Sequence, residues 1–141
     1  MQSKYPNIIY RQGDLLSAYQ DGITVIGHQC NCLGVWNGGL HRQIGRRFPE
    51  VIRQYLAHQW KLGDMRIFDT HIPNFRIAYL AGQYAYGNSQ KTGKVYTRLH
   101  ALCAAMEKLA KTLSPADRLA FPHDTHGNPF PVLDATSKTV E

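Results

Sequence analysis

Two kinds of apolar pattern alternate along this chain, and their order limits the folds that it can adopt. Short runs of β-branched and aromatic residues predict strands, and longer stretches with apolar residues every three or four positions predict helices. The predicted strands are residues 7–12, 23–30, 65–72, 75–83 and 118–122, and the predicted helices are a short one after Asp14 and residues 38–48, 49–60 and 95–113. Because the helices are distributed between the strands, we expect an α/β three-layer sandwich, with a mixed central sheet and helices on both faces.

Polar residues and prolines mark where several of these elements begin and end. The carboxylate of Asp14 can cap a short helix by accepting a hydrogen bond from a free backbone N–H group. Pro49 suits the first turn of a helix, where its missing N–H costs nothing. Pro73 and Asn74 predict a turn between two strands. In such α/β folds, ligands bind beyond the carboxyl ends of the strands.

Charge, hydropathy and cysteine content narrow the function classes. The net charge of +6 favours anionic partners, but no stripe of basic and aromatic residues predicts a nucleic-acid surface. We expect no membrane partner and a cytoplasmic location, because the chain has no long apolar run and its first ten residues lack the apolar core of a secretory signal. The three cysteines do not predict a disulfide framework, and the length suits one domain over residues 1–141.

The most informative stretch is residues 28–40, where an apolar strand runs into polar residues, then a glycine-bearing loop, then a helix. Glycines let a backbone approach a phosphate closely, and a helix start offers free N–H groups and the positive end of a dipole. The stretch is therefore compatible with an anion site, although its spacing matches neither a Walker nor a Rossmann motif. A glycine-rich turn without a ligand is the alternative.

Several motifs, taken in order, resemble those of macro domains. They are Gly13-Asp14-Leu15-Leu16, Cys30-Asn31-Cys32, Trp36-Asn37-Gly38-Gly39-Leu40, Phe48-Pro49-Glu50, residues 81–87 and Tyr96-Thr97-Arg98-Leu99. The chain is especially similar to the Appr-1-p-processing branch, which includes ADP-ribose-1″-phosphate phosphatases. The resemblance covers about residues 7–122. It implies a pocket for ADP-ribose or a derivative, hydrolysis of ADP-ribose 1″-phosphate or another distal-ribose derivative, and no cofactor. The alternatives are a non-catalytic ADP-ribose-binding module and, third, a basic nucleic-acid-binding domain.

The same resemblance assigns ligand-binding roles to Asp14, Leu15, Asn31, Gly38, Gly39, Leu40, Gly82 and Gln83. The Asp14 carboxylate would accept a hydrogen bond from the exocyclic amine of adenine, unless its role is only that of a helix cap. Backbone N–H groups of residues 38–40 would face the diphosphate. Asn31, Gly82 and Gln83 would border the distal ribose, and a turn-forming role is the alternative for Asn31.

His28 and Asn31 are the predicted catalytic residues. A neutral imidazole can exchange a proton near pH 7, but a lone histidine in an apolar strand is also typical of a core residue. Cys30 and Cys32 alternate with His28 on one strand, a spacing unlike that of zinc sites, so we expect no metal. Gln83 stands where another branch of macro domains, which removes ADP-ribose from proteins or nucleic acid, uses a lysine. This difference argues against a lysine adduct.

The segment 123–141 departs from the family pattern. Macro domains follow the strand at residues 119–122 with a second glycine-rich phosphate loop and a helix, whereas this segment has one glycine and two prolines. We expect it to be mobile and the diphosphate site to be weaker, with His123 and His126 as candidates for replacement contacts. Homodimer packing could cover the sheet face that the last helix leaves open. The sequence leaves open whether the ligand is a free metabolite or an ADP-ribosylated macromolecule.

Overall fold

A computed structural model describes residues 5–36, 39–86 and 96–123 of the chain, so the predictions for Gly38, the start of the helix at 95–113 and residues 124–141 lie outside the described residues. The helical elements are η1 (Leu15–Asp21, a 3-10 helix), α1 (Gly39–Arg47), α2 (Pro49–Ala57) and α4 (Leu99–Thr112). The strands are β1 (Val25–Gln29), β2 (Met65–Asp69), β3 (Arg76–Leu80) and β4 (Leu119–Ala120). No helix in this described part has the length and apolar content needed to cross a membrane.

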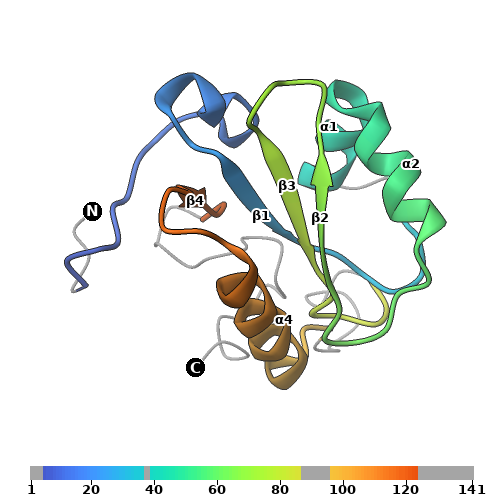
Figure 1. Ribbon diagram of the computed structural model, residues 1–141. Coiled ribbons are helices and arrows are strands. Elements are labelled where there is room, and N and C mark those ends of the chain that lie inside the picture. Colours follow the sequence, from blue (N-terminus) through green and yellow to red (C-terminus); the bar gives the residue numbers. More distant parts are fainter. Residues whose placement is uncertain (1–4, 37–38, 87–95, 124–141) are drawn as a thin grey trace.

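The strands form one mixed sheet in the order β2-β3-β1-β4. β1 is parallel to both β3 and β4, and β2 is antiparallel to β3. Helices α1 and α2 cover one face of the sheet and α4 covers the other, so the predicted three-layer sandwich is confirmed (Figure 1). Since β1 and β3 are parallel, the loops that follow them leave from the same edge of the sheet.

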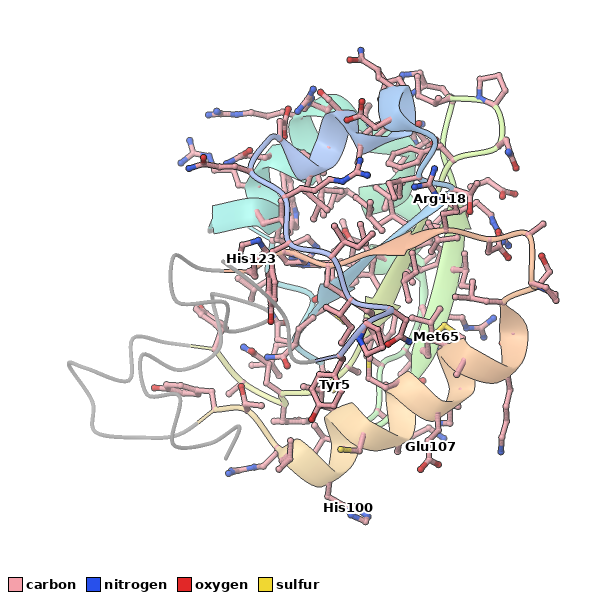
Figure 2. The ribbon with its side chains drawn as sticks, turned by 90° about the vertical axis from the view of Figure 1, so that its left-hand side faces the viewer. Tyr5, Met65, His100, Glu107, Arg118 and His123 are labelled. Carbon is pink, nitrogen blue, oxygen red and sulfur yellow. The ribbon has the colours of Figure 1, made fainter. Side chains whose placement is uncertain are left out.

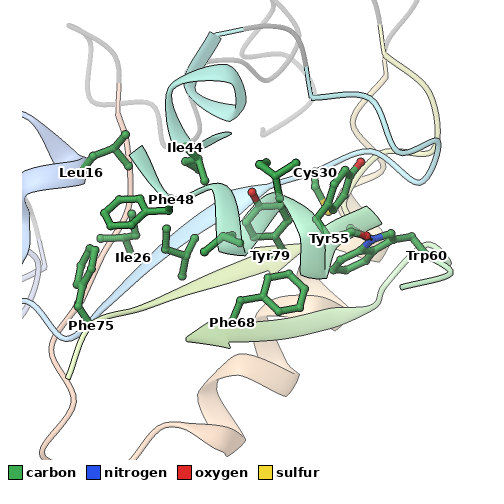
Figure 3. Packing of buried hydrophobic residues seen from close by; sticks show 14 residues of the cluster. Leu16, Ile26, Cys30, Ile44, Phe48, Tyr55, Trp60, Phe68, Phe75 and Tyr79 are labelled. Carbon is green, nitrogen blue, oxygen red and sulfur yellow. The ribbon is translucent and has the colours of Figure 1, made fainter. Parts of the chain in front are cut away.

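Side chains alternate between the two faces and build a core on each. In β3, for example, Ile77 and Tyr79 belong to the core under α1 and α2, whereas Ala78 and Leu80 belong to the core under α4. The core under α1 and α2 is rich in aromatic rings, and Figure 3 shows it from close by. Its large buried members include Tyr55, Trp60, Phe68, Phe75 and Tyr79.

The predicted first strand, residues 7–12, is wrong. This segment forms no strand, and the side chains of Ile8 and Ile9 are 47% and 71% exposed. A β-branched run becomes a strand only where a neighbour pairs with its backbone and covers its side chains. The edge strand next to β1 is β4. It has only two residues, so it offers little backbone with which residues 7–12 could pair.

The other elements exist as predicted but are shorter. Helix α2 ends at Ala57 instead of residue 60, because His58 turns to an extended conformation and the Trp60 indole N–H donates to the Tyr55 carbonyl at 2.9 Å. The strand predicted at 65–72 ends at Asp69, before a turn in which the Thr70 hydroxyl donates to the Phe75 carbonyl at 2.7 Å. The strand predicted at 75–83 begins after this turn, at Arg76, and ends at Leu80. Asn74 in this turn has φ = 58°, a left-handed conformation that asparagine tolerates.

Candidate functional site

The loops after β1 and β3 are joined by backbone hydrogen bonds at the carboxyl edge of the sheet. The N–H of Cys30 donates to the Leu80 carbonyl at 2.9 Å, and that of Cys32 donates to the Tyr84 carbonyl at 3.0 Å. The structure thus places the predicted site residues Asn31, Gly82 and Gln83 on two loops that lie side by side. A ligand at this edge would touch both loops.

Asn31 is buried, and its carboxamide shapes the loop that it begins. The side-chain oxygen accepts hydrogen bonds from the N–H groups of Leu33 (3.0 Å) and Val35 (3.2 Å) and from the Tyr55 hydroxyl (3.0 Å). The side-chain nitrogen donates to the Val35 carbonyl at 2.9 Å. These contacts favour the turn-forming role that the sequence left open as an alternative. Asn31 could bind a ligand as well only through a hydrogen-bonding position of its carboxamide that these bonds leave unused.

His28 lies in the core beneath this loop. Its ring centroid is 4.8 Å from that of His41 and 5.1 Å from that of Tyr79, and the residue is only 3% exposed. Burial lowers the pKa of His28 well below its ordinary value, and the neighbouring His41 lowers it further, so the imidazole is neutral at pH 7. The geometry favours the core-residue alternative, because the ring is almost fully buried among other aromatic rings.

Three buried polar atoms of this cluster have no hydrogen-bond partner among the described residues. They are Nε2 of His28, Nε2 of His41 and the hydroxyl oxygen of Tyr79. Burial lowers the pKa of His41 to about 4. The Tyr55 hydroxyl, in contrast, donates to both the carbonyl and the side-chain oxygen of Asn31. The aromatic core is therefore tied to the candidate site through Tyr55.

Helix α1 begins directly beside the first loop. Gly39, its first residue, is exposed with φ = 51°, and Leu40 packs partly buried against the core. Trp36, just before the helix, lies over Gly45, where an added Cβ would come within 2.6 Å of the indole ring. This contact folds the loop back along α1. The first turn of a helix has N–H groups without partners inside the helix, so an anion at this end of α1 stays a prediction.

The second loop is fastened by an amide network. Gln29 Nε2 donates to Gln83 Oε1 at 2.5 Å and to the Thr97 hydroxyl at 3.3 Å, and Gln83 Nε2 donates to the Ala85 carbonyl at 2.9 Å. Gly82 leaves the room that Gln29 occupies, because a Cβ there would lie 2.6 Å from Gln29 Oε1. In this structure the predicted ligand residue Gln83 orders its own loop.

Asp14 and Leu15 lie in a separate part of the molecule, at the start of η1. As predicted, Asp14 caps this helix, since its Oδ1 accepts from the Leu16 N–H at 3.1 Å. Its Oδ2 accepts from the Ser17 hydroxyl at 3.0 Å and from the Arg47 guanidinium. The bond from Arg47 is the main reason why the pKa of Asp14 is lowered.

Asp14 and Leu15 line a cavity of about 530 Å³ between residues 7–15 and residues 118–123. Figure 2 shows its two walls, with the N-terminal segment running beside the stretch from Arg118 to His123. His123 is one of the lining residues, with Nε2 3.3 Å from the Arg11 carbonyl and its ring packed edge-on against Tyr10. The cavity lies beside the segment that does not form the predicted strand, and its volume is in the range of small-ligand pockets.

Comparison with known proteins adds two kinds of likeness, although no family model matches the sequence. Over 49 residues the chain is 33% identical to an ADP-ribose 1″-phosphate phosphatase of Meyerozyma guilliermondii, covering 35% of this chain and 28% of that protein. Over 54 residues it is 37% identical to a protein of the same name from Scheffersomyces stipitis, covering 36% and 31%. The match therefore spans less than a third of either relative's length.

The structure of a macrodomain protein from Streptomyces coelicolor superimposes on the chain with a TM-score of 0.60 and 22% identity, covering 72% of this chain and 68% of that one. This chain has a macrodomain fold. The macro-domain fold that the motifs led us to expect is thus confirmed, and the partial matches are to proteins named for the Appr-1-p-processing activity.

The sequence did not indicate every residue that shapes the candidate site. Gln29 and Thr97 fix the second loop, and Ser17 and Arg47 fix Asp14. Gln29 could have been recognised from the sequence, because it is a polar residue at the end of an apolar strand. Arg47 offered none, because its partner lies 33 positions away in the sequence.

The described residues were compared with the patterns of metal sites and of reactive thiols. Within residues 5–36, 39–86 and 96–123, no group of three His, Cys, Asp or Glu side chains could bind a metal ion. Burial raises the pKa of the Cys30 thiol well above its ordinary value, and it raises that of Cys32 as well. Both thiols are therefore protonated at pH 7 and behave as small apolar side chains.

Proposed function

We propose that this macrodomain binds ADP-ribose and hydrolyses ADP-ribose 1″-phosphate or a related derivative of the distal ribose. The observation that carries the proposal is the position of Asp14, a fixed, ionised carboxylate on the wall of a cavity large enough for a nucleoside. The names of the relatives, ADP-ribose 1″-phosphate phosphatase, support the same ligand class.

Helix α1 relates the two parts of the proposed site. Its last residue, Arg47, contacts Asp14, and its first residue, Gly39, follows the loop that Asn31 shapes. The helix has nine residues, so its ends lie about 12 Å apart at about 1.5 Å per residue. A ligand with a base at one end, phosphates in the middle and a sugar at the other end has the extended shape that such a separation requires.

Each part of the ligand would meet chemistry that suits it. The Asp14 carboxylate can only accept hydrogen bonds, so it would select a base that carries an amino group. The first-turn N–H groups of α1 would face the diphosphate, aided by the positive end of the helix dipole. The loops at 30–36 and 81–86 would enclose the distal ribose.

Hydrolysis would rest on position more than on proton transfer by a side chain. A water oxygen would attack the phosphorus of the 1″-phosphate, the bond from phosphorus to the ribose oxygen would break, and that oxygen would leave with a proton. Phosphoryl transfer of this kind is accelerated mainly by alignment and by donors to the phosphate oxygens. Asn31 would help to align the substrate through the loop that it shapes. His28 would support this loop from the core.

Calorimetric titration with ADP-ribose tests the binding half, with AMP and ribose 5-phosphate as controls for the two ends of the ligand. We expect micromolar binding by the wild type and none by Asp14→Ala. Release of inorganic phosphate from ADP-ribose 1″-phosphate tests the catalytic half. Binding without phosphate release would favour a non-catalytic ADP-ribose-binding module. A folded protein that fails to bind ADP-ribose would refute the proposal as a whole.

The proposal also concerns whether the ligand is attached to a macromolecule, where the protein is located and whether it forms a dimer. The distal ribose end, at the sheet edge, is where a macromolecule would remain attached in an ADP-ribosylated substrate. The cysteines Cys30, Cys32 and Cys103 are free thiols, which suits a cytoplasmic location. Sedimentation at micromolar concentration would decide whether the chain forms the homodimer that the atypical C-terminal segment suggests.

A further inference from the structure

Three side chains form a closed ring of hydrogen bonds around Asp14, the one member of the ring that lines the cavity beside η1. The Ser17 hydroxyl donates to Asp14 Oδ2 at 3.0 Å, Arg47 Nη1 donates to the same oxygen, and Arg47 Nη2 contacts the Ser17 hydroxyl oxygen at 2.8 Å. The forked guanidinium thus binds a carboxylate and the hydroxyl that supports it. Ser17 belongs to η1, Asp14 is the cap that precedes it, and Arg47 ends α1.

This ring leaves the Asp14 carboxylate with little freedom. An ionised carboxylate has about four acceptor positions. Leu16 N–H uses one on Oδ1, and Ser17 and Arg47 use two on Oδ2. About one position is therefore left for a donor from a ligand, and its direction is fixed by the other three bonds.

The exposure of this ring argues against a mainly stabilising role. The side chains of Arg47 and Asp14 are 41% and 49% exposed, and ion pairs at such positions contribute little to folding. Asp14 lines the cavity, whereas Arg47 is not among the residues that line it. Arg47 therefore reaches Asp14 from outside the cavity and leaves the inner side of the carboxylate to the ligand.

We infer that Arg47 is a positioning residue that sets the base specificity of the cavity, by fixing Asp14 so that it accepts from an amino group and rejects a carbonyl. The inference rests on the proposed function, since it assumes that the cavity takes the purine of ADP-ribose. Adenine offers a donor at its C6 position, whereas hypoxanthine offers an acceptor there. A fixed carboxylate would repel that acceptor, but a free one can rotate away from it.

The test compares the affinities of ADP-ribose and its hypoxanthine analogue, measured by calorimetry on the full chain. In the wild type we expect a preference of about tenfold or more for ADP-ribose, because a hydrogen bond to a charged group is worth at least that ratio. In Arg47→Ala we expect the preference to fall about fivefold, mostly through weaker ADP-ribose binding. Arg47→Lys should recover part of it, since an ammonium can reach Asp14 but cannot fork to Ser17.

Arg46→Ala is the matched control, because it removes the same charge from an exposed neighbouring position on α1. We expect this variant to keep the wild-type preference and Arg47→Ala to melt at the same temperature as the control. An unchanged preference in Arg47→Ala would overturn the inference while leaving the proposed function intact. Tighter ADP-ribose binding by that variant would also overturn it, since Arg47 would then be a competitor for Asp14. If the folded wild type binds neither ligand, both the proposed function and the inference fail.

Discussion

Two buried tyrosines of the same aromatic core differ in one respect that stability measurements can resolve. Tyr55 donates its hydroxyl hydrogen to the Asn31 carbonyl (2.9 Å) and side-chain oxygen (3.0 Å), whereas the Tyr79 hydroxyl is buried without a partner in the described part of the chain. Their ring centroids are 5.3 Å apart, so both rings belong to one packed environment. Replacing each with phenylalanine removes only the hydroxyl and keeps the ring.

The expected effects are opposite in sign. Tyr55→Phe leaves two buried acceptors of Asn31 with one donor fewer, which costs about 1–2 kcal/mol of unfolding free energy. For a chain of 141 residues this corresponds to a fall in melting temperature of about 3–6 °C. Tyr79→Phe removes a buried hydroxyl that makes no hydrogen bond to any described residue, so we expect it to be neutral or stabilising by up to about 1 kcal/mol.

Urea unfolding followed by tryptophan fluorescence measures both variants on the same scale, because Trp60 lies within the cluster. Tyr55→Phe should also weaken ADP-ribose binding, since the loop that Asn31 shapes loses an anchor. The reasoning fails if Tyr79→Phe destabilises the protein as much as Tyr55→Phe does. It also fails if Tyr55→Phe has the stability of the wild type.

Two further predictions concern acid and close packing. Burial lowers the pKa of His28 and His41, the latter to about 4, so the unfolded chain binds more protons than the folded one below the ordinary value of about 6.5. The contribution of the two histidines to stability should therefore be fully present above pH 6.5. The unfolding free energy should fall as the pH drops towards 4, by up to about 1.4 kcal/mol per pH unit for each histidine. Urea unfolding at pH 7 and pH 5 measures this fall, and an equal fall in His28→Phe would contradict the prediction. Gly27→Ala should lower the unfolding free energy by about 1–3 kcal/mol, because its Cβ would lie 2.1 Å from the Phe121 ring. Gly13→Ala, where a Cβ meets nothing within 4 Å, is the control, and similar melting temperatures for the two variants would refute the packing argument.

Periodicity predicted the sheet and its helices because those signals are local. Pro49 begins α2 and Asp14 caps η1 as expected, since each depends only on residues within one turn. The prediction of a strand at residues 7–12 was wrong because a strand also needs a pairing partner that is distant in the sequence. The same limit explains His28, whose burial among rings from α1 and β3 could not be read from its own strand.

The candidate site was predicted in part for the same reason. Asn31, Gly82 and Gln83 fall together because parallel strands carry their loops to one edge, which is a property of the fold class. The hydrogen-bond partners of those side chains within the protein could not be predicted, because each partner comes from another segment of the chain. Tyr55 for Asn31 and Gln29 for Gln83 are the partners that the structure supplies.

Because Gln29 contacts both Gly82 and Gln83, the loop at 81–86 cannot be exchanged between related domains independently of residue 29. The shape of the second loop is determined partly by a strand residue that lies 54 positions before Gln83. A side chain larger than glycine at position 82 would collide with the Gln29 amide, and another residue at 83 would lose its bond to it. A grafted loop that carries lysine at position 83 would therefore keep its native shape only if residue 29 were replaced along with it.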